Sequence, residues 1–482
     1  MLNIKSVKSN KKTFEYILLM LNILFSSSLY SALKSPINHA DYIIISPSEF
    51  SDALIEFVHY KNSNNLNTLN ICLDSIYAEF PDSLSQANSI RNFISYAIQF
   101  WQTPPKYCLL AGGINHIPSF QFLCHVDSIL ISIDEWYSIN KYNQYNIPEI
   151  ALGRFPARNE NELINMVHKS IQFDGFHSYE NQFLFVADYD STSFGATTAF
   201  ENCVDDFIHQ FQISETCYSR IDLRKTSPYY GTETDIFNVL NHDVLYFSYY
   251  GHGHPLFWSK SHIMKINEID TFLDNQHPFI LTAAACNQIF DDPLQKSLIE
   301  TLMSFETKGT VAIIGSAGLN FLYNESSFLD HFYSQIFNNS NTTLGDAFLT
   351  AKCSLENERE KEEGYIRRIT LLGDPSLKLP LGNMAEIEIM DNNIPHKIHL
   401  SQNYPNPFNS ETTIGFNIKQ PSFVVLKIYN IKGQEIATLV KRYCSSGNHL
   451  VIWQPGDLSS GLYFYKLQAG NLFKIKKLIF QK

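Results

Sequence analysis

Short runs of apolar and β-branched residues recur along the first 380 residues of the chain and predict buried strands. Amphipathic stretches with a helix-like spacing of apolar residues lie between them. Strands and helices that alternate in this way form a mostly parallel sheet covered by helices, so we expect an α/β fold for this part. The predicted strands are 42–45, 107–110, 183–187, 244–250, 279–283 and 310–314, and the predicted helices are 51–60, 89–101, 160–173, 197–211 and 294–307.

The pattern changes from Leu400 onward, where short stretches alternate apolar with polar residues and turn signals such as Lys432-Gly433 separate them. Such strands predict a small antiparallel, immunoglobulin-like sandwich. The stretch before it contains Asn392, Asn393 and Pro395 and is typical of a linker. The predicted strands of the sandwich are 412–418, 423–429, 435–440, 448–453, 462–468 and 472–480.

The N-terminus has the layout of a secretory signal peptide. Four lysines between Lys5 and Lys12 precede an apolar stretch from 16 to 25, and three serines from Ser26 to Ser28 follow it. An uncleaved anchor is the alternative, but Asn22 and the serines leave less than the roughly 20 apolar residues that a membrane span needs. We therefore expect four segments: a signal peptide at 1–32, a first domain at 33–381, a linker at 382–399 and a second domain at 400–482.

Charge is distributed unevenly between the two predicted domains. The whole chain carries a formal net charge of -12, whereas residues 401–482 hold ten Lys or Arg against three Asp or Glu, which leaves -19 for the rest. Such asymmetry supports separate modules. The negative first domain argues against binding to nucleic acid or to an anionic membrane surface, because phosphate contacts need a basic face.

The cysteines predict no metal framework. The chain has eight, without a CxxC pair or a zinc-like spacing, so neither a metal site nor a disulfide connectivity follows from them. Export would bring them into an oxidising compartment, where disulfides can form. Cys286 differs from the others by its context, because it directly follows an apolar run that ends in Ala283-Ala284-Ala285.

Three chemically active side chains follow three of the predicted strands. Cys286 follows the strand at 279–283, His252 follows the strand at 244–250, and Asp188 follows the strand at 183–187. The functional crevice of an open parallel sheet lies at the carboxyl ends of its strands, so these side chains can meet. A thiol is mostly protonated at neutral pH and needs a neighbouring imidazole to supply the reactive thiolate. We therefore expect Cys286 as nucleophile and His252 as base.

The remaining members of the predicted site are less sharply defined. Asp188 would orient the second ring nitrogen of His252, with Asp190 as the alternative carboxylate. The backbone amides of Gly253 and Cys286 would form the oxyanion hole. Two alternatives stay open at this point: a buried structural cysteine, or a zinc site that uses the histidines of Gly251-His252-Gly253-His254 with His242 and His262.

The first domain resembles the gingipain-like cysteine peptidases, which are related to caspases in fold and in catalytic dyad. The motifs that carry the resemblance are Asp41 to Ser46, Leu109 to Gly112, Ile117-Pro118, Leu152 to Pro156, Tyr249 to Gly253, Ala284 to Cys286 and Gly373 to Leu377. The resemblance implies a caspase-like fold and hydrolysis of peptide bonds through a thioester. On the matching positions it implies Cys286 as nucleophile, His252 as base and acid, and Asp188 as the orienting carboxylate.

One departure from the family pattern motivates a rival function. The chain has Gly112-Gly113 where the family usually has Gly-Asp. The rival is a catalytically inactive surface protein that keeps the peptidase fold as a binding or structural platform. A third alternative is a processing peptidase dedicated to exported partners. The resemblance implies no cofactor for the chemistry, and it suggests a structural calcium ion.

The second domain resembles the C-terminal sorting domain of type IX secretion. The motifs that carry this resemblance are Leu400 to Asn409, Ile428 to Asn430, Ser460 to Tyr463 and Lys476-Lys477. A carbohydrate-binding or adhesive sandwich is the alternative. The resemblance implies export by the type IX machinery across an outer membrane, and a secreted or cell-surface protein whose substrates are proteins or peptides.

Overall fold

A computed structural model describes residues 32–123, 130–143, 147–174, 181–189, 198–214, 217–242, 244–286, 288, 292, 294–338, 342–359, 364–379, 399–418, 422–444, 447–456, 458–469 and 472–481. The predicted signal peptide and linker lie outside the described residues, except for the last residue of each. Within these ranges, no helix is both long and apolar enough to cross a bilayer.

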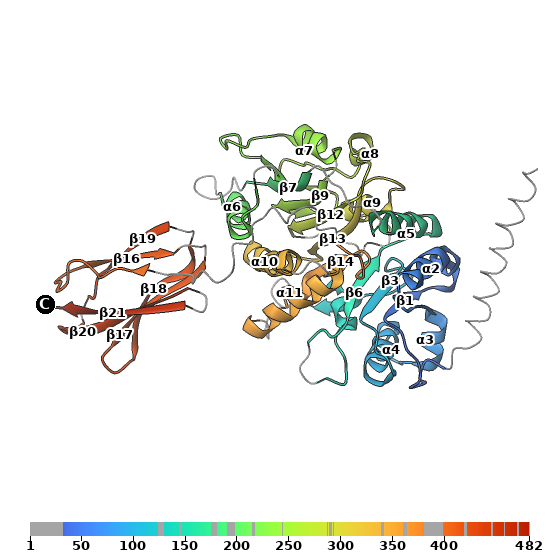
Figure 1. Cartoon of the computed structure of the whole chain (residues 1–482), viewed down its shortest axis with the longest axis horizontal. Coiled ribbons are helices and arrows are strands. Elements are labelled where there is room, and N and C mark those ends of the chain that lie inside the picture. The colour runs from blue at the N-terminus through green and yellow to red at the C-terminus, as the bar shows by residue number, and fades with distance from the viewer. Residues whose placement is uncertain are drawn as a thin grey trace, which may run out of the picture. The chain divides into compact units, whose positions relative to one another are not determined.

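The first domain is built on one large sheet of ten strands, visible in the centre of this domain in Figure 1. Its strands are β1 (Tyr42–Ser46), β2 (Thr68–Cys72), β3 (Tyr107–Ala111), β6 (Ala151–Phe155), β7 (Asn181–Ala187), β8 (Tyr218–Asp222), β9 (Val244–Tyr250), β12 (Phe279–Ala284), β13 (Thr310–Ser316) and β14 (Ile369–Leu372). Two short hairpins accompany the sheet, β4 (Phe120–Leu123) with β5 (Leu130–Ile133), and β10 (Gly253–His254) with β11 (Phe257–Trp258).

The order of the strands divides this sheet into two parallel blocks. The order is β2-β1-β3-β6-β14-β13-β12-β9-β7-β8. Strands β13, β12, β9, β7 and β8 run parallel to one another. Strand β14 pairs antiparallel with β13 and meets β6 at a single register position, Leu372 with Arg154, whereas β6, β3, β1 and β2 run parallel to one another. The carboxyl ends of β7, β9, β12 and β13 therefore share one edge.

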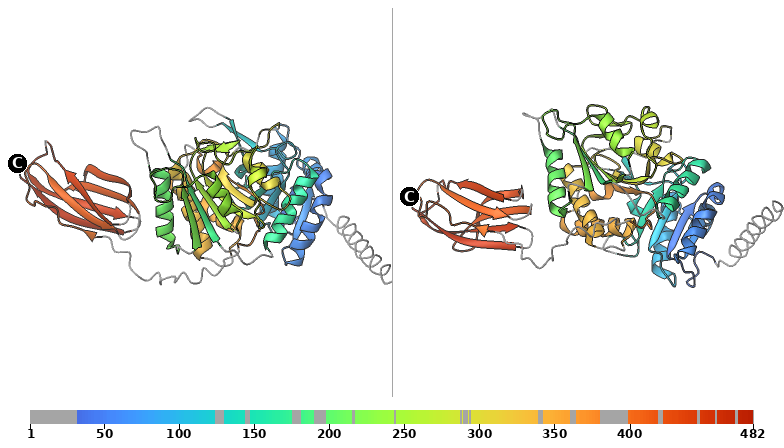
Figure 2. Two further views of the ribbon diagram at one scale, coloured as in Figure 1. Left: turned by 90° about the horizontal axis from the view of Figure 1, so that it is seen from above. Right: turned by 45° about the horizontal axis from the view of Figure 1, so that its top comes forward.

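Helices lie against both faces of the sheet (Figures 1 and 2). Helices α2, α5, α7 and α9 join a core cluster with strand residues such as Phe247 and Leu281, whereas α4 packs on residues of the opposite face such as Ile43 and Leu110. The helices are η1 (Ser48–Phe50), η2 (Asp52–Leu54), α2 (Ile55–Ser63), α3 (Leu73–Glu79), α4 (Gln86–Phe100), η3 (Glu135–Tyr137), α5 (Glu160–Asp174), α6 (Ala199–Phe211), α7 (Glu233–Leu240), α8 (Ile269–Phe272), α9 (Leu298–Ser304), α10 (Leu322–Asn338), α11 (Leu344–Arg359) and η5 (Ile366–Arg368).

The predicted fold class is confirmed, and the six predicted strands of the first domain are all present. The hairpin strands β4, β5, β10 and β11 were not predicted, nor were four strands of the large sheet, β2, β6, β8 and β14. Each of the four has only four or five residues, and β8 is half-buried over its first three positions. A run of four or five residues gives a weak periodic signal, and mixed burial weakens it further in β2 and β8, so the sequence pattern did not separate these strands from loops.

The second domain is the expected antiparallel sandwich. One sheet has the order β15-β16-β19 and the other β18-β17-β20-β21. Its core contains Ile414, Leu426, Trp453, Tyr465 and Leu478, all buried. The strands are β15 (His399–Leu400), β16 (Thr412–Ile418), β17 (Ser422–Asn430), β18 (Glu435–Cys444), β19 (Gly447–Trp453), β20 (Gly461–Ala469) and β21 (Leu472–Phe480).

Candidate active site

Asp188 lies directly after β7 and is almost completely buried. Its main-chain N–H donates to the carbonyl oxygen of Tyr250 at the end of the adjacent strand β9. The carboxylate accepts hydrogen bonds from the hydroxyl of Ser259 at 2.8 Å and from the hydroxyl of Tyr249 at 3.4 Å. It also accepts one from the main-chain N–H of His252 at 3.2 Å. Asp188 is therefore an anchor for the segment that carries His252.

This contact differs from the one predicted for Asp188. The sequence analysis expected its carboxylate to bind the imidazole ring of His252, whereas the hydrogen bond in this structure runs to the backbone of His252. The turn explains the difference, because a Cβ atom on Gly251 would lie 2.5 Å from the Cβ atom of Asp188. The chain passes so close to the carboxylate that the amide of the next residue is the nearest donor. Orientation of the ring by Asp188 stays a prediction.

The imidazole of His252 is held by packing. Its ring lies edge-on to Phe200 of α6, with 5.3 Å between the ring centroids. The main-chain carbonyl oxygen of His252 accepts hydrogen bonds from the hydroxyl of Tyr249 and from the main-chain N–H of Ser259. The Nε2 atom is buried and, within the described part of the chain, has no hydrogen-bond partner. A buried imidazole nitrogen without a partner is costly unless it serves a function, and a base that awaits a proton is such a function.

The loop after β9 and the loop after β12 are in direct contact. A Cβ atom on Gly253 would lie 2.0 Å from the main-chain carbonyl oxygen of Cys286 and 2.6 Å from the side-chain Nε2 atom of Gln288. The pairing of β9 with β12 continues beyond the strands, because the N–H of Gly251 donates to the carbonyl of Ala284. The structure thus brings the segments of Asp188, His252 and Cys286 to one edge of the sheet, as the strand order requires.

The sulfur of Cys286 contacts the main chain of Asn320, which lies between β13 and α10. The Asn320 N–H donates to Sγ at 3.3 Å, and the thiol donates to the Asn320 carbonyl at 3.1 Å. Burial raises the pKa of the Cys286 thiol, and the carboxyl group of Glu325 raises it further, whereas the Asn320 N–H and the guanidinium of Arg368 lower it. The net result is a thiol that rests in its protonated form at neutral pH.

Gln288 connects the two loops, and the sequence analysis did not identify it. Its side chain accepts from the indole N–H of Trp258 at 3.1 Å and donates to the carbonyl of Cys286 at 3.4 Å. Trp258 belongs to β11, which pairs with Gly253. Gln288 therefore ties the hairpin that follows His252 to the backbone of Cys286. The usable signal was its place two residues after the cysteine, within the same strand-end loop.

Asp190, the alternative carboxylate for orienting His252, lies outside the described residues. The oxyanion hole formed by the backbone amides of Gly253 and Cys286 stays a prediction. In the part of the chain that is described, no group of three or more His, Cys, Asp or Glu is arranged to hold a metal ion. The zinc alternative thus has no such ligand set among these residues, whereas the structural calcium ion, whose ligands include carbonyl oxygens, stays a prediction.

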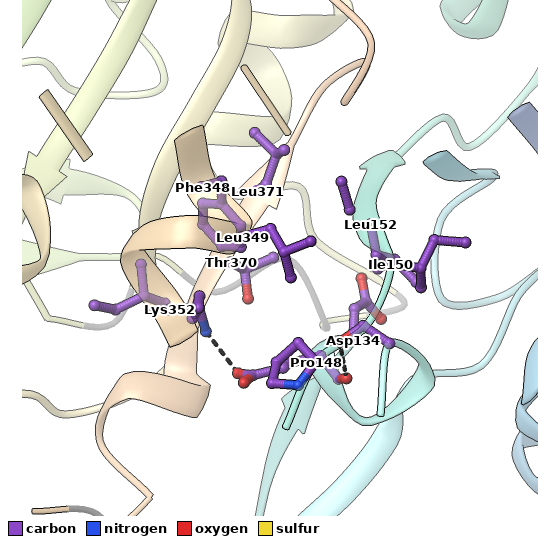
Figure 3. A pocket seen from close by; sticks show the side chains of 13 residues that line it. Asp134, Pro148, Ile150, Leu152, Phe348, Leu349, Lys352, Thr370 and Leu371 are labelled. Carbon is purple, nitrogen blue, oxygen red and sulfur yellow. Dashed lines mark hydrogen bonds and ion pairs between the residues drawn. The ribbon is translucent and has the colours of Figure 1, made fainter. Parts of the chain in front are cut away.

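A small cavity of about 20 Å³ lies away from these residues, between β6, β14 and α11 (Figure 3). Its wall includes an ion pair in which the ammonium of Lys352 lies 2.6 Å from the carboxylate of Glu135. The volume suffices for about one water molecule. The cavity is therefore a packing feature that joins α11 to the loop of η3.

Gly253→Ala is expected to lower kcat/KM about 100-fold. The added methyl group would meet the backbone of Cys286, which cannot rotate away, so the His252 loop must shift by about 1 Å relative to the nucleophile. Steady-state cleavage of a peptide by the full chain would measure the loss. Gly461→Ala is the matched control, since its nearest neighbour would be 3.9 Å away. Unchanged activity in Gly253→Ala would show that the contact of these loops is unimportant for turnover.

Comparison with known sequences identifies a family for each of the two domains. Residues 35–380 match the profile of peptidase family C25, and residues 402–481 match that of a secretion system C-terminal sorting domain. Gingipain R2 of Porphyromonas gingivalis is 24% identical over 345 residues, which are 70% of this chain and 45% of that protein. The chain thus spans less than half the length of this curated relative.

Solved structures show the same fold. The complex of the pro- and mature domains of RgpB from Porphyromonas gingivalis matches with a TM-score of 0.59 and 18% identity, covering 91% of this chain and 100% of that chain. The crystal structure of the Arg-specific cysteine proteinase gingipain R (RgpB) matches with a TM-score of 0.58 and 18% identity, covering 94% of this chain and 100% of that chain.

Proposed function

Because this chain belongs to peptidase family C25, we propose that it is a secreted cysteine endopeptidase with Cys286 as nucleophile and His252 as base and acid. His252 removes the thiol proton, and the thiolate attacks the carbonyl carbon of the scissile peptide bond. The tetrahedral intermediate collapses to a thioester as the peptide C–N bond breaks, and His252 gives its proton to the leaving amine. Water then hydrolyses the thioester, which releases the acid and restores the thiol.

One observation carries this proposal above the others: the loop of His252 packs directly on the main chain of Cys286 through Gly253. The contact puts the two residues on adjacent loops at one edge of the sheet, as a base and its nucleophile require. The buried Nε2 atom of His252, which has no partner among the described residues, supports the role of base. The N–H groups of Gly253 and Cys286 would then stabilise the oxyanion, each by on the order of 3 kcal/mol.

The sorting domain indicates where the proposed enzyme acts. Its match to the secretion system sorting family supports transport by the type IX machinery across an outer membrane. Release into the medium or attachment to the cell surface would follow. Protein or peptide substrates outside the cell are the corresponding proposal for its partners.

The full chain is expected to react covalently with peptidyl acyloxymethyl ketones that vary in the side chain next to the reactive group. These probes need both a bound peptide and an activated thiolate, so Cys286 should be modified at least about tenfold faster than Cys72, a half-buried free thiol in the same chain. Peptide mass spectrometry after tryptic digestion would locate the adduct. Cleavage of an unfolded protein, with new termini identified by the same method, is the companion assay.

A catalytically inactive protein that serves as a binding or structural platform remains the second candidate, because the Cys286 thiol rests in its protonated form. In this structure the Cys286 thiol donates to Asn320, and its pKa is raised by burial. If the probes modify Cys286 no faster than Cys72 and no substrate is cut, the platform function holds and the peptidase proposal is wrong. Modification of Cys286 without turnover of any protein would point to the narrow processing peptidase.

A further inference from the structure

Asn320 binds the sulfur of Cys286 by two main-chain hydrogen bonds. Its N–H donates to the sulfur, and its carbonyl oxygen accepts from the thiol. A thiolate keeps the first contact but loses the second, since it has no proton to donate and would face a carbonyl oxygen at close range. The state of the sulfur therefore depends on how firmly Asn320 is fixed.

Asn320 is fixed by its buried side chain. Its amide group donates to the hydroxyl of Ser316 at 2.8 Å and to the carbonyl of Tyr365 at 3.2 Å, and its amide oxygen accepts from the N–H of Phe321. Ser316 is the last residue of β13 and is completely buried. The position of the Asn320 main chain behind the sulfur is thus set by the hydroxyl of Ser316.

A buried acid forms the far end of this chain of hydrogen bonds. Glu325 lies in the first turn of α10, is 4% exposed, and is hydrogen-bonded to Ser316. Its Oε1 atom is buried without a hydrogen-bond partner among the described residues. Burial raises the pKa of Glu325 to about 8, so the group is protonated at neutral pH. A buried acid with an unsatisfied oxygen costs stability, which a purely structural residue would avoid.

The other charged or titratable groups at this place are few in the described part of the chain. Cys286 follows β12, and the guanidinium of Arg368 at η5 acts on the same sulfur. Arg368 is buried, donates to the carbonyl of Leu319, and lies over the ring of Tyr365 at 4.6 Å. Arg368 thus favours a negative sulfur, whereas an ionised Glu325 opposes it.

We propose that Glu325, at the far end of the chain of hydrogen bonds that runs through Ser316 and Asn320 to the nucleophile Cys286, is a positioning residue whose charge determines how readily the Cys286 thiol ionises. The inference rests on the proposed function only in taking Cys286 as the nucleophile. When Glu325 is protonated, the site holds one negative charge at most, on the sulfur. When Glu325 is ionised, a second negative charge in the same buried region is unfavourable, so a rise in pH forms the thiolate less readily than it would alone.

The test is the reactivity of Cys286 toward iodoacetamide in the intact full chain between pH 6 and pH 10, followed by peptide mass spectrometry. Glu325→Gln keeps the length of the side chain and its hydrogen bond to Ser316 but cannot ionise. We expect the midpoint of alkylation to fall by about one pH unit, with a gain in thiolate of up to about tenfold that appears only above about pH 8, where Glu325 of the wild type is ionised. In peptide assays above this pH the gain should appear in kcat rather than in KM.

Asp330→Asn is the matched control, because it removes a carboxylate from the same helix more than one turn further along. Its alkylation curve should coincide with that of the wild type. If Glu325→Gln alters the circular dichroism spectrum, Glu325→Met provides the second neutral variant, with the same expected shift. Equal midpoints in the wild type and the folded neutral variant would overturn the proposal, as would an equal shift in Asp330→Asn.

The outcome is separable from that of the proposed function. Alkylation needs no peptide bond to be cut, so a wild type without peptidase activity would refute the enzyme while the midpoints still decide the role of Glu325. Conversely, an active peptidase with coincident alkylation curves would refute only the role of Glu325.

Discussion

Replacing Cys286 with alanine is expected to lower kcat/KM for peptide cleavage by at least about 10⁴-fold. Without the thiol no thioester forms, and only binding and the oxyanion amides still act on the substrate. The fold should persist, because Cys286 is half-buried and its sulfur contacts only the main chain of Asn320 among the hydrogen-bonding groups described. Progress curves with a fluorogenic peptide would give the activity, and thermal unfolding would give the stability.

Cys72→Ala is the control for this experiment. It removes a thiol of similar exposure from β2, at the far edge of the same sheet, and should leave kcat/KM within about twofold. Activity that survives in Cys286→Ala and is abolished in Cys72→Ala would reverse the assignment of the nucleophile. Activity equal to that of the wild type in both variants would show that neither thiol takes part in the mechanism.

The sequence predicted the edge of the sheet at which the candidate residues meet. Asp188, His252 and Cys286 follow β7, β9 and β12, which are adjacent in the sheet and parallel. This prediction needed only the rule that parallel strands deliver their carboxyl ends to one edge. Asn320 follows β13, the next strand in the same order, so the same rule would have placed its loop beside Cys286.

What the sequence could not predict is the contacts made by the main chain. The carboxylate of Asp188 binds the main-chain amide of His252, and the main chain of Asn320 binds the sulfur of Cys286, so one partner in each contact is a group that every residue possesses. Glu325 was hidden for a second reason. It lies at the start of α10, a helix that was not predicted, and an isolated glutamate in a sequence gives no sign that it is buried. Such positions depend on packing between elements far apart in the chain.

The reversal in the middle of the large sheet was equally beyond the sequence pattern. Strand β14 has four residues, all buried, and periodicity carries no information on strand direction. Its antiparallel pairing with β13 separates the two blocks of parallel strands. Gly113, where the family usually has Asp, lies in the loop after β3, and its N–H donates to the carbonyl of Ala157 in the loop after β6.

His252→Ala is expected to lower kcat/KM about 10³-fold, because the thiol loses its base and the leaving amine loses its acid. The chain should remain folded, since Asp188 binds the backbone amide at this position and the Ala variant keeps that amide. The decrease should appear mainly in kcat, as the imidazole acts in the transition state rather than in ground-state binding. Steady-state kinetics over a range of peptide concentrations separates the two constants.

The chain offers a close control for this prediction in His254, the second histidine of the same motif. Its ring is exposed and stacks on Phe257 at 4.2 Å, and its Nδ1 atom accepts from the N–H of Leu256 within the hairpin. His254→Ala should therefore change kcat/KM by less than about threefold, a typical effect of a substitution at the surface. A large loss in His254→Ala with retained activity in His252→Ala would place the base on the other histidine, and the buried Nε2 atom of His252 would then need a structural explanation.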